Sequence, residues 1–113
     1  MPSYERSRPR YLREIAHARS GDKGSDVNIG VIAKTPADYQ ELVRTLTPER
    51  VKSFFSEVCH KEVLRYELPN LNAINFLLKG ALGSGGSASL RSDAQGKAFG
   101  EALLHSDLNE ATH

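Results

Sequence analysis

Seven residues in the first quarter of the chain hold its densest cluster of side chains that could do chemistry. Residues 20–26 read Ser-Gly-Asp-Lys-Gly-Ser-Asp, and they separate two runs whose composition is typical of strands. Gly21 and Gly24 permit positive φ angles, so backbone N–H groups here can converge on one point. Together with the Ser20 hydroxyl and the Lys23 ammonium, they could surround a phosphate or an acyl-CoA group. We therefore predict an anion-binding turn.

Other interpretations of this turn stay open. It could be a tight polar connection that satisfies only its own backbone. Asp22 and Asp26 would repel an anion unless they turn away from it or hold a cation, and their spacing matches no established metal-ligand pattern. Ser20 and Lys23 also have the S-x-x-K spacing of serine acyl enzymes. That motif needs a helix, whereas the glycines favour a turn.

A histidine near this turn adds a candidate for acid–base chemistry. His17 and Arg19 share one face of the predicted first strand, and histidine is the side chain that most readily exchanges a proton near neutral pH. A lone histidine on a strand is more often structural. The catalytic candidates are therefore His17, Asp22 and Lys23, with no metal predicted. The ligand-binding candidates are Ser20, Gly21, Lys23, Gly24 and Asn28.

A second glycine-rich segment has the letters of a dinucleotide fingerprint without its setting. Residues 83–88 read Gly-Ser-Gly-Gly-Ser-Ala, which fits G-x-G-x-x-A, but that motif needs a βαβ unit around it. We predict a flexible connection instead, or a lid that forms the opposite wall of the first turn.

Composition narrows the class of protein. The 113 residues suffice for one domain, with 39% hydrophobic and 26% charged residues as in ordinary globular proteins. A formal net charge of +1 gives no basic field for nucleic acid. Cys59 is the single cysteine, which excludes an intramolecular disulfide. No signal peptide and no apolar run of about 18 residues is present, so we expect a cytoplasmic protein without a membrane contact.

The periodicity of apolar residues predicts the elements. Residues 12–33 should form a hairpin, with Val27, Ile29 and Val31 on one face. Thr35-Pro36 and Thr47-Pro48 should open two tandem helices, 36–46 and 48–58. Their apolar stripes are Tyr39/Leu42/Val43/Leu46 and Val51/Phe54/Phe55/Val58.

The second half of the chain continues the pattern. Residues 62–68 alternate as a strand, whereas residues 74–78 fit either a helix or a buried strand. A last helix should follow Asp93, and Gly96 and Gly100 on one of its faces indicate a close approach to the sheet. We expect a flexible arm at residues 1–10, one domain at 11–105 and a frayed tail at 106–113.

Strands mixed with helices, without strict βαβ alternation, indicate an α+β fold: a mainly antiparallel sheet with helices on one face. The other face needs cover, and Ile32 and Ile15 should point to it. We therefore expect a homo-oligomer or a complex with another chain.

Several segments resemble one known family. Ala18-Arg-Ser-Gly-Asp-Lys-Gly24, Asn28-Ile-Gly-Val-Ile-Ala33, Tyr66-Glu-Leu-Pro-Asn-Leu71, Gly80-Ala-Leu-Gly83 and Asp93-Ala-Gln-Gly-Lys97 are similar to blocks of the C-terminal domain of the acyclic terpene utilisation (AtuA-like) family, in the same order. The resemblance covers about residues 11–104 and implies a ferredoxin-like two-layer sandwich. Long members of that family carry a large N-terminal domain, and we expect this chain to be a stand-alone copy of the small one.

The resemblance also implies a function. It suggests a link to the breakdown of acyclic terpenes such as citronellol and geraniol, or of related branched acids carried as CoA thioesters. Our first hypothesis is an accessory domain or subunit that binds an anionic ligand such as a CoA thioester, or completes the site of a large AtuA-like chain. The second is an independent small enzyme that acts on an acyl or carbonyl substrate. The third is a structural oligomerisation module.

Overall fold

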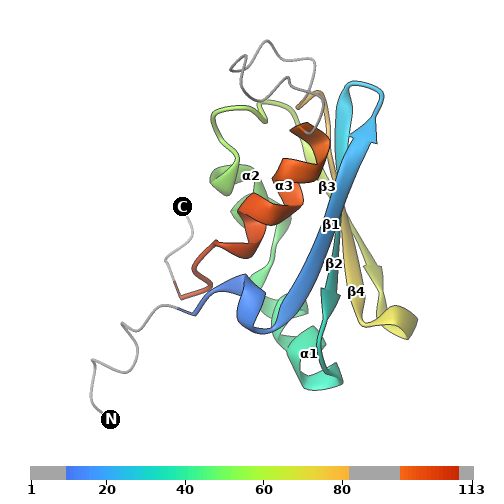
Figure 1. Ribbon diagram of the computed structural model, residues 1–113, viewed down its shortest axis with the longest axis vertical. Helices are drawn as coiled ribbons and strands as arrows, with labels where there is room; N and C mark the ends of the chain where they lie inside the picture. The colour runs from blue at the N-terminus through green and yellow to red at the C-terminus, as the bar shows by residue number, and fades with distance from the viewer. Residues whose placement is uncertain (1–9, 82–94, 110–113) are drawn as a thin grey trace.

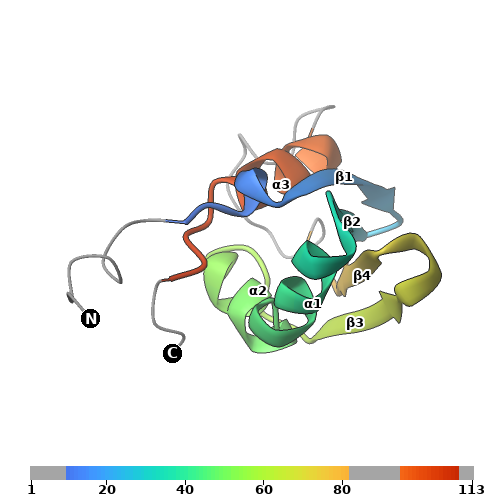
Figure 2. The same ribbon diagram turned by 90° about the horizontal axis from the view of Figure 1, so that it is seen from below.

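The computed structural model describes residues 10–81 and 95–109. In this part of the chain a four-stranded antiparallel sheet carries the helices on one face (Figures 1 and 2). The strands lie in the order β1-β2-β4-β3, so β2 and β4 are central and the other two are edges. Their bounds are Ala16–Lys23 for β1, Asp26–Ala33 for β2, Val63–Leu68 for β3 and Ala73–Leu78 for β4. The predicted α+β, ferredoxin-like class is confirmed.

The two tandem helices form where the Thr-Pro pairs predict them. Helix α1 spans Pro36–Thr45 and α2 spans Pro48–Phe54. The hydroxyl oxygens of Thr35 and Thr47 accept hydrogen bonds from backbone N–H groups three residues further on, each over 3.0 Å. Each proline takes the first helical position, where its missing N–H costs nothing. A third helix, α3, spans Gln95–Leu104. No helix in the described residues is long and apolar enough to cross a membrane.

Helix α2 ends earlier than predicted, and one of its phenylalanines is exposed. Residues 55–58 continue as turns instead of helix. Phe54 is 41% exposed, whereas Val51, Phe55 and Val58 are buried as expected. The first stripe is confirmed more fully, because Tyr39, Leu42 and Leu46 are buried and Val43 packs against the core.

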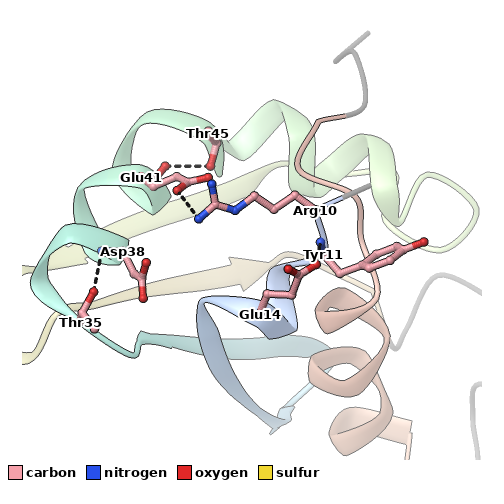
Figure 3. Close-up of polar contacts among 7 residues, drawn as sticks. All are labelled: Arg10, Tyr11, Glu14, Thr35, Asp38, Glu41 and Thr45. Carbon is pink, nitrogen blue, oxygen red and sulfur yellow. Dashed lines mark hydrogen bonds and ion pairs between the residues drawn. The ribbon is translucent and has the colours of Figure 1, made fainter. Parts of the chain in front are cut away.

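The two ends of the described domain contact each other. The Arg10 guanidinium pairs with Glu41 of α1 over 3.0 Å (Figure 3), and the Arg10 N–H donates to the Asp107 carboxylate over 3.0 Å. The Leu108 N–H donates to the Arg10 carbonyl oxygen over 2.7 Å, and its side chain is buried. We expected an arm through residue 10 and a frayed tail from 106. Residues 10 and 106–108 are instead packed, because Leu108 adds apolar surface to the core.

The start of the predicted hairpin also differs. Leu12–Glu14 is a 3₁₀ turn, held by a hydrogen bond from the Tyr11 N–H to the Glu14 carboxylate over 2.8 Å (Figure 3). Ile15 follows this turn and is only 4% exposed. The prediction that Ile15 points to the uncovered sheet face is therefore wrong, since the 3₁₀ turn directs it into the core.

The ambiguous segment 74–78 is the central strand β4. It pairs with β2 on one side and β3 on the other, and Ile74, Phe76 and Leu78 are fully buried. The 3₁₀ turn Pro69–Leu71 and Asn72, in the left-handed region at φ 52°, reverse the chain between β3 and β4. Strand pairing on both sides settles what the short apolar run left open.

Candidate functional site

The predicted anion-binding turn is shorter than its composition indicated. Strands β1 and β2 stay paired as far as Lys23 and Asp26, so the loop consists of Gly24 and Ser25 alone. Gly24 has φ 64°, and glycine at the first central position is typical of a tight two-residue hairpin. The prediction of a seven-residue turn at 20–26 is therefore wrong. These strand residues lie beyond the apolar centre of the sheet, and their polar side chains look like those of a loop.

Strand geometry separates the predicted ligand-binding residues. Successive side chains of a strand point to opposite faces, which places Ser20 and Asp22 on the helix side and Gly21 and Lys23 on the other. The Ser20 hydroxyl oxygen accepts a hydrogen bond from the Gly100 N–H over 2.6 Å. Ser20 therefore joins β1 to α3, and the structure does not bring it together with Lys23.

The three catalytic candidates do not meet either. His17 and Lys23 share a face of β1 but lie six residues apart, roughly 20 Å along an extended strand. Asp22 lies on the opposite face. All three side chains are exposed. The residues 83–87 that we expected to form an opposite wall lie outside the described part of the chain.

Asp26 has a structural partner at each of its carboxylate oxygens. One oxygen accepts a hydrogen bond from the Gly80 N–H over 2.7 Å, and the other pairs with the Lys79 ammonium at 3.1 Å. The bond from Gly80, together with Lys79, holds the pKa of Asp26 below the ordinary aspartate value of 3.8. This carboxylate therefore ties the start of β2 to the end of β4.

The sheet face turned away from the helices is the larger candidate surface, and we call it the open face. Strand register and side-chain alternation assign its members. They are His17, Arg19, Gly21 and Lys23 on β1; Asp26, Asn28, Gly30 and Ile32 on β2; Ala73, Asn75 and Leu77 on β4; and Leu64, Tyr66 and Leu68 on β3. Figure 2 looks along the sheet and shows the helices gathered on its other side.

A polar row crosses the middle of the open face. Arg19, Gly30, Asn75 and Tyr66 are register neighbours on the four strands. The Asn75 amide donates to the Asn28 side-chain oxygen over 2.6 Å, which fixes both amides on the central strands. Within the described residues, Arg19 forms no ion pair, so its charge is available to a ligand. Asn28 thus keeps a place in the candidate site, at a position different from the hairpin loop.

An apolar hollow borders this row. Gly30 and Ala73 form its floor, Ile32, Leu68 and Leu71 its walls, and Asn75 one end, with a volume of about 370 Å³. Ile32 and Leu68 are each 41% exposed and Leu71 is 66% exposed. Volumes of this size are typical of small-molecule sites. Large apolar side chains gathered in one exposed place usually mark a binding surface.

Sequence reasoning missed this hollow, although one signal for it was available. The alternation of residues 62–68 correctly separates Leu64, Tyr66 and Leu68 from Val63, Arg65 and Glu67. The apolar set would ordinarily be assigned to the core. In the structure the apolar set faces away from the helices. Arg65 faces the helices, where its guanidinium donates to the carbonyl oxygens of Val43 and Leu46 over 3.1 and 3.0 Å.

Comparison with known proteins agrees with this architecture. The family model for the AtuA ferredoxin-like domain matches residues 10–109, nearly the whole chain. Neither the curated proteins nor the solved structures yielded a match. In the described residues no group of histidine, cysteine, aspartate and glutamate side chains is arranged to hold a metal ion. A match of this extent establishes the family: the chain belongs to the AtuA ferredoxin-like domain family.

Proposed function

We propose that this domain is an accessory domain or subunit in the catabolism of acyclic terpenes or of related branched acids carried as CoA thioesters. In that role it docks onto a larger chain through the open face and completes that chain's site. The observation that carries the proposal is the apolar half of this face. Of the five large apolar side chains exposed in the described residues, four belong to the open face or its margin: Ile32, Tyr66, Leu68 and Leu71.

The direction of β3 strengthens this argument. A domain that worked alone would gain stability by turning the more apolar face of this edge strand toward its helices. Here Leu64, Tyr66 and Leu68 face away, and the charged Arg65 faces inward. An arrangement that keeps apolar surface in water is favourable when a second surface covers it.

The geometry gives less support to an independent enzyme. A pocket that enclosed Lys23 and His17 together would have favoured that function. The two side chains are exposed and lie roughly 20 Å apart along β1. An exposed apolar sheet face is the feature expected of a docking domain. We therefore keep the accessory role as the proposal.

A binding experiment with a matched control tests the proposal. A tagged form of the chain is co-expressed with a large AtuA-like N-terminal-type chain, and retention on the affinity matrix is measured. We expect retention, and we expect Tyr66→Asp to abolish it, because a carboxylate would be placed inside the interface. Phe54→Asp is the control, since Phe54 is also exposed but belongs to α2.

Two outcomes would contradict the proposal. Retention that Tyr66→Asp and Phe54→Asp reduce equally would show that the open face is not the interface. If light scattering showed that the chain alone forms a stable dimer that Tyr66→Asp dissociates, the face would instead join two copies, as an oligomerisation module requires.

A further inference from the structure

We propose that the hollow on the open face binds the apolar chain of a branched carboxylic acid or its thioester, and that Arg19 binds the anionic or polarised head. The inference rests on the proposed function, because it names the ligand of the site that the domain completes. It places that ligand away from the hairpin loop, where the sequence predicted an anion site. The shared chemistry is a short, branched apolar chain joined to an acyl group.

The dimensions of the hollow favour one acyl chain over a larger partner element. Ile32, Ala73 and Leu68 are register neighbours on three strands. The two walls therefore stand two strand spacings apart, roughly 10 Å between backbones, and their side chains narrow this gap. An α-helix with its side chains is about 10–12 Å across, so it cannot enter. A single hydrocarbon chain can lie between the walls, and its branching is taken from the proposed function.

The floor of the hollow consists of residues with small side chains or none. Ala73 supplies a methyl group and Gly30 supplies only backbone. A Cβ added at Gly30 would meet the Asn75 amide oxygen at 3.7 Å and the Arg19 carbonyl oxygen at 3.9 Å, which are ordinary contact distances. Steric crowding and a positive φ therefore do not explain the glycine. The absence of a side chain here keeps the hollow continuous with the polar row.

The charge next to the hollow suits an acyl head group. Arg19 pairs with Gly30 in the register, so its backbone lies one strand from the floor and its side chain projects on the same face. His17 is the corresponding neighbour of Ile32. The anchored Asn75 amide at the end of the hollow adds a neutral polar group. The nearest carboxylate on this face, Asp26, is already paired with Lys79. An anion or a carbonyl oxygen thus meets positive charge at the β1 side of the hollow.

Titration of the chain followed by amide chemical shifts tests this inference. The probes are a methyl-branched octanoate, its CoA thioester, the corresponding alcohol and CoA alone. We expect the acid and the thioester to shift the amides of Ile32, Leu71 and Ala73, and CoA alone to leave them in place. Tighter binding of the thioester than of the acid would identify the thioester as the ligand, and the reverse order would identify the free acid.

Three variants separate the chain-binding and head-binding parts. Gly30→Val fills the floor of the hollow and should weaken the binding of the acid and of the alcohol alike by about tenfold or more. Valine suits a strand, so the fold should persist. Arg19→Gln should weaken the binding of the acid about two- to fivefold, the scale of an exposed ion pair. The acid should then bind no more tightly than the alcohol. Leu71→Ser, on an exposed turn, should weaken both about threefold.

The control and the contradicting results are equally specific. Arg44→Gln removes an exposed arginine from α1 and should keep the difference between acid and alcohol. Affinities that do not respond to Gly30→Val would overturn the inference. So would a loss of anion binding in Lys23→Ala with none in Arg19→Gln, which would place the site at the hairpin loop. Retention of the large chain that depends on Tyr66, without any binding of the acid or thioester, would show that the hollow is not a ligand site and would leave the proposed function standing.

Discussion

The backbone N–H of Gly100 donates a hydrogen bond to the side-chain oxygen of Ser20 over 2.6 Å. The two residues are 80 positions apart, and their contact joins α3 to the edge strand β1. A Cβ added at Gly100 would lie 2.9 Å from the Ser20 hydroxyl oxygen and 3.2 Å from its backbone nitrogen. Gly100 is therefore required for the close approach of helix and strand, and Ser20 has a structural role that its place in the predicted turn did not indicate.

Replacement of Gly100 by alanine should destabilise the domain. Alanine would gain about 1 kcal/mol in helix propensity, but the contact with Ser20 backbone must open, and overpacking of this kind typically costs about 1–3 kcal/mol. We expect a net loss of up to about 2 kcal/mol, measured by urea denaturation. Gly21→Ala is the control, because a Cβ at Gly21 meets no atom within 4 Å. Equal midpoints for both variants would show that the helix can move away at no cost.

The sequence predicted the parts of this fold that depend on local chemistry. The Thr-Pro starts of α1 and α2 are local hydrogen-bonding patterns, and they appear where expected. The expectation that glycines in the last helix bring it close to the sheet is confirmed at Gly100. The alternation of β3 was correct as well. In each case the sequence signal lies within a few neighbouring residues, although the contact that Gly100 makes possible is with Ser20, 80 positions away.

The features that sequence missed depend on partners far along the chain. Residues 74–78 form a strand because β2 and β3 pair with both edges, which no local period reveals. The segment from Ser20 to Lys23 looked like a loop because its side chains are polar or absent. It is a strand because its backbone pairs with β2. The hollow arises from β3 facing its apolar side outward, and Arg65 explains that orientation through carbonyl groups about 20 residues earlier. The candidate site residues that we chose by composition therefore lie at the hairpin, whereas the hollow lies nearer the other end of the sheet.

Arg65 should stabilise the domain through the end of α1. Its guanidinium donates to the carbonyl oxygens of Val43 and Leu46, groups that the helix itself leaves without partners at its last turn. Its side chain is 16% exposed. Arg65→Lys should cost about 1–2 kcal/mol of unfolding free energy, because one ammonium cannot reproduce the planar set of donors.

Arg44→Lys provides the comparison for Arg65→Lys, as it makes the same exchange at an exposed position of α1. Its unfolding free energy should stay within about 0.5 kcal/mol of the unchanged protein. The carbonyl-capping role of Arg65 is excluded if the two variants unfold at the same urea concentration.

Cys59 should react slowly with thiol reagents in the folded protein. Its side chain is 2% exposed, and burial raises the pKa of its thiol, so the reactive thiolate is scarce. It borders a surface hollow that also includes Lys52, a cation that would activate an exposed thiol. We expect modification by a disulfide reagent to be slow in buffer and fast in denaturant. Rapid, complete modification of the native chain would show that this hollow opens onto the sulfur.

The tie between Asp26 and the end of β4 should make stability depend on pH in a predictable direction. Because the hydrogen bond from Gly80, aided by Lys79, lowers the pKa of Asp26 below 3.8, folding favours the ionised carboxylate. The stabilisation is then fully present above 3.8 and is lost as the pH falls through the lower pKa of the folded protein. Asp26→Asn should unfold more easily than the unchanged protein near neutral pH, and the difference should shrink on acidification.

Asp22→Asn is the control. It removes an exposed carboxylate of the same hairpin that has no hydrogen bond or ion pair in the described residues, and its unfolding free energy should differ less from that of the unchanged protein at every pH. Unfolding free energies of the three proteins, measured across this pH range, decide the matter: a gap between Asp26→Asn and the unchanged chain that persists well below pH 3.8 would mean that the carboxylate's charge does not stabilise this corner of the sheet.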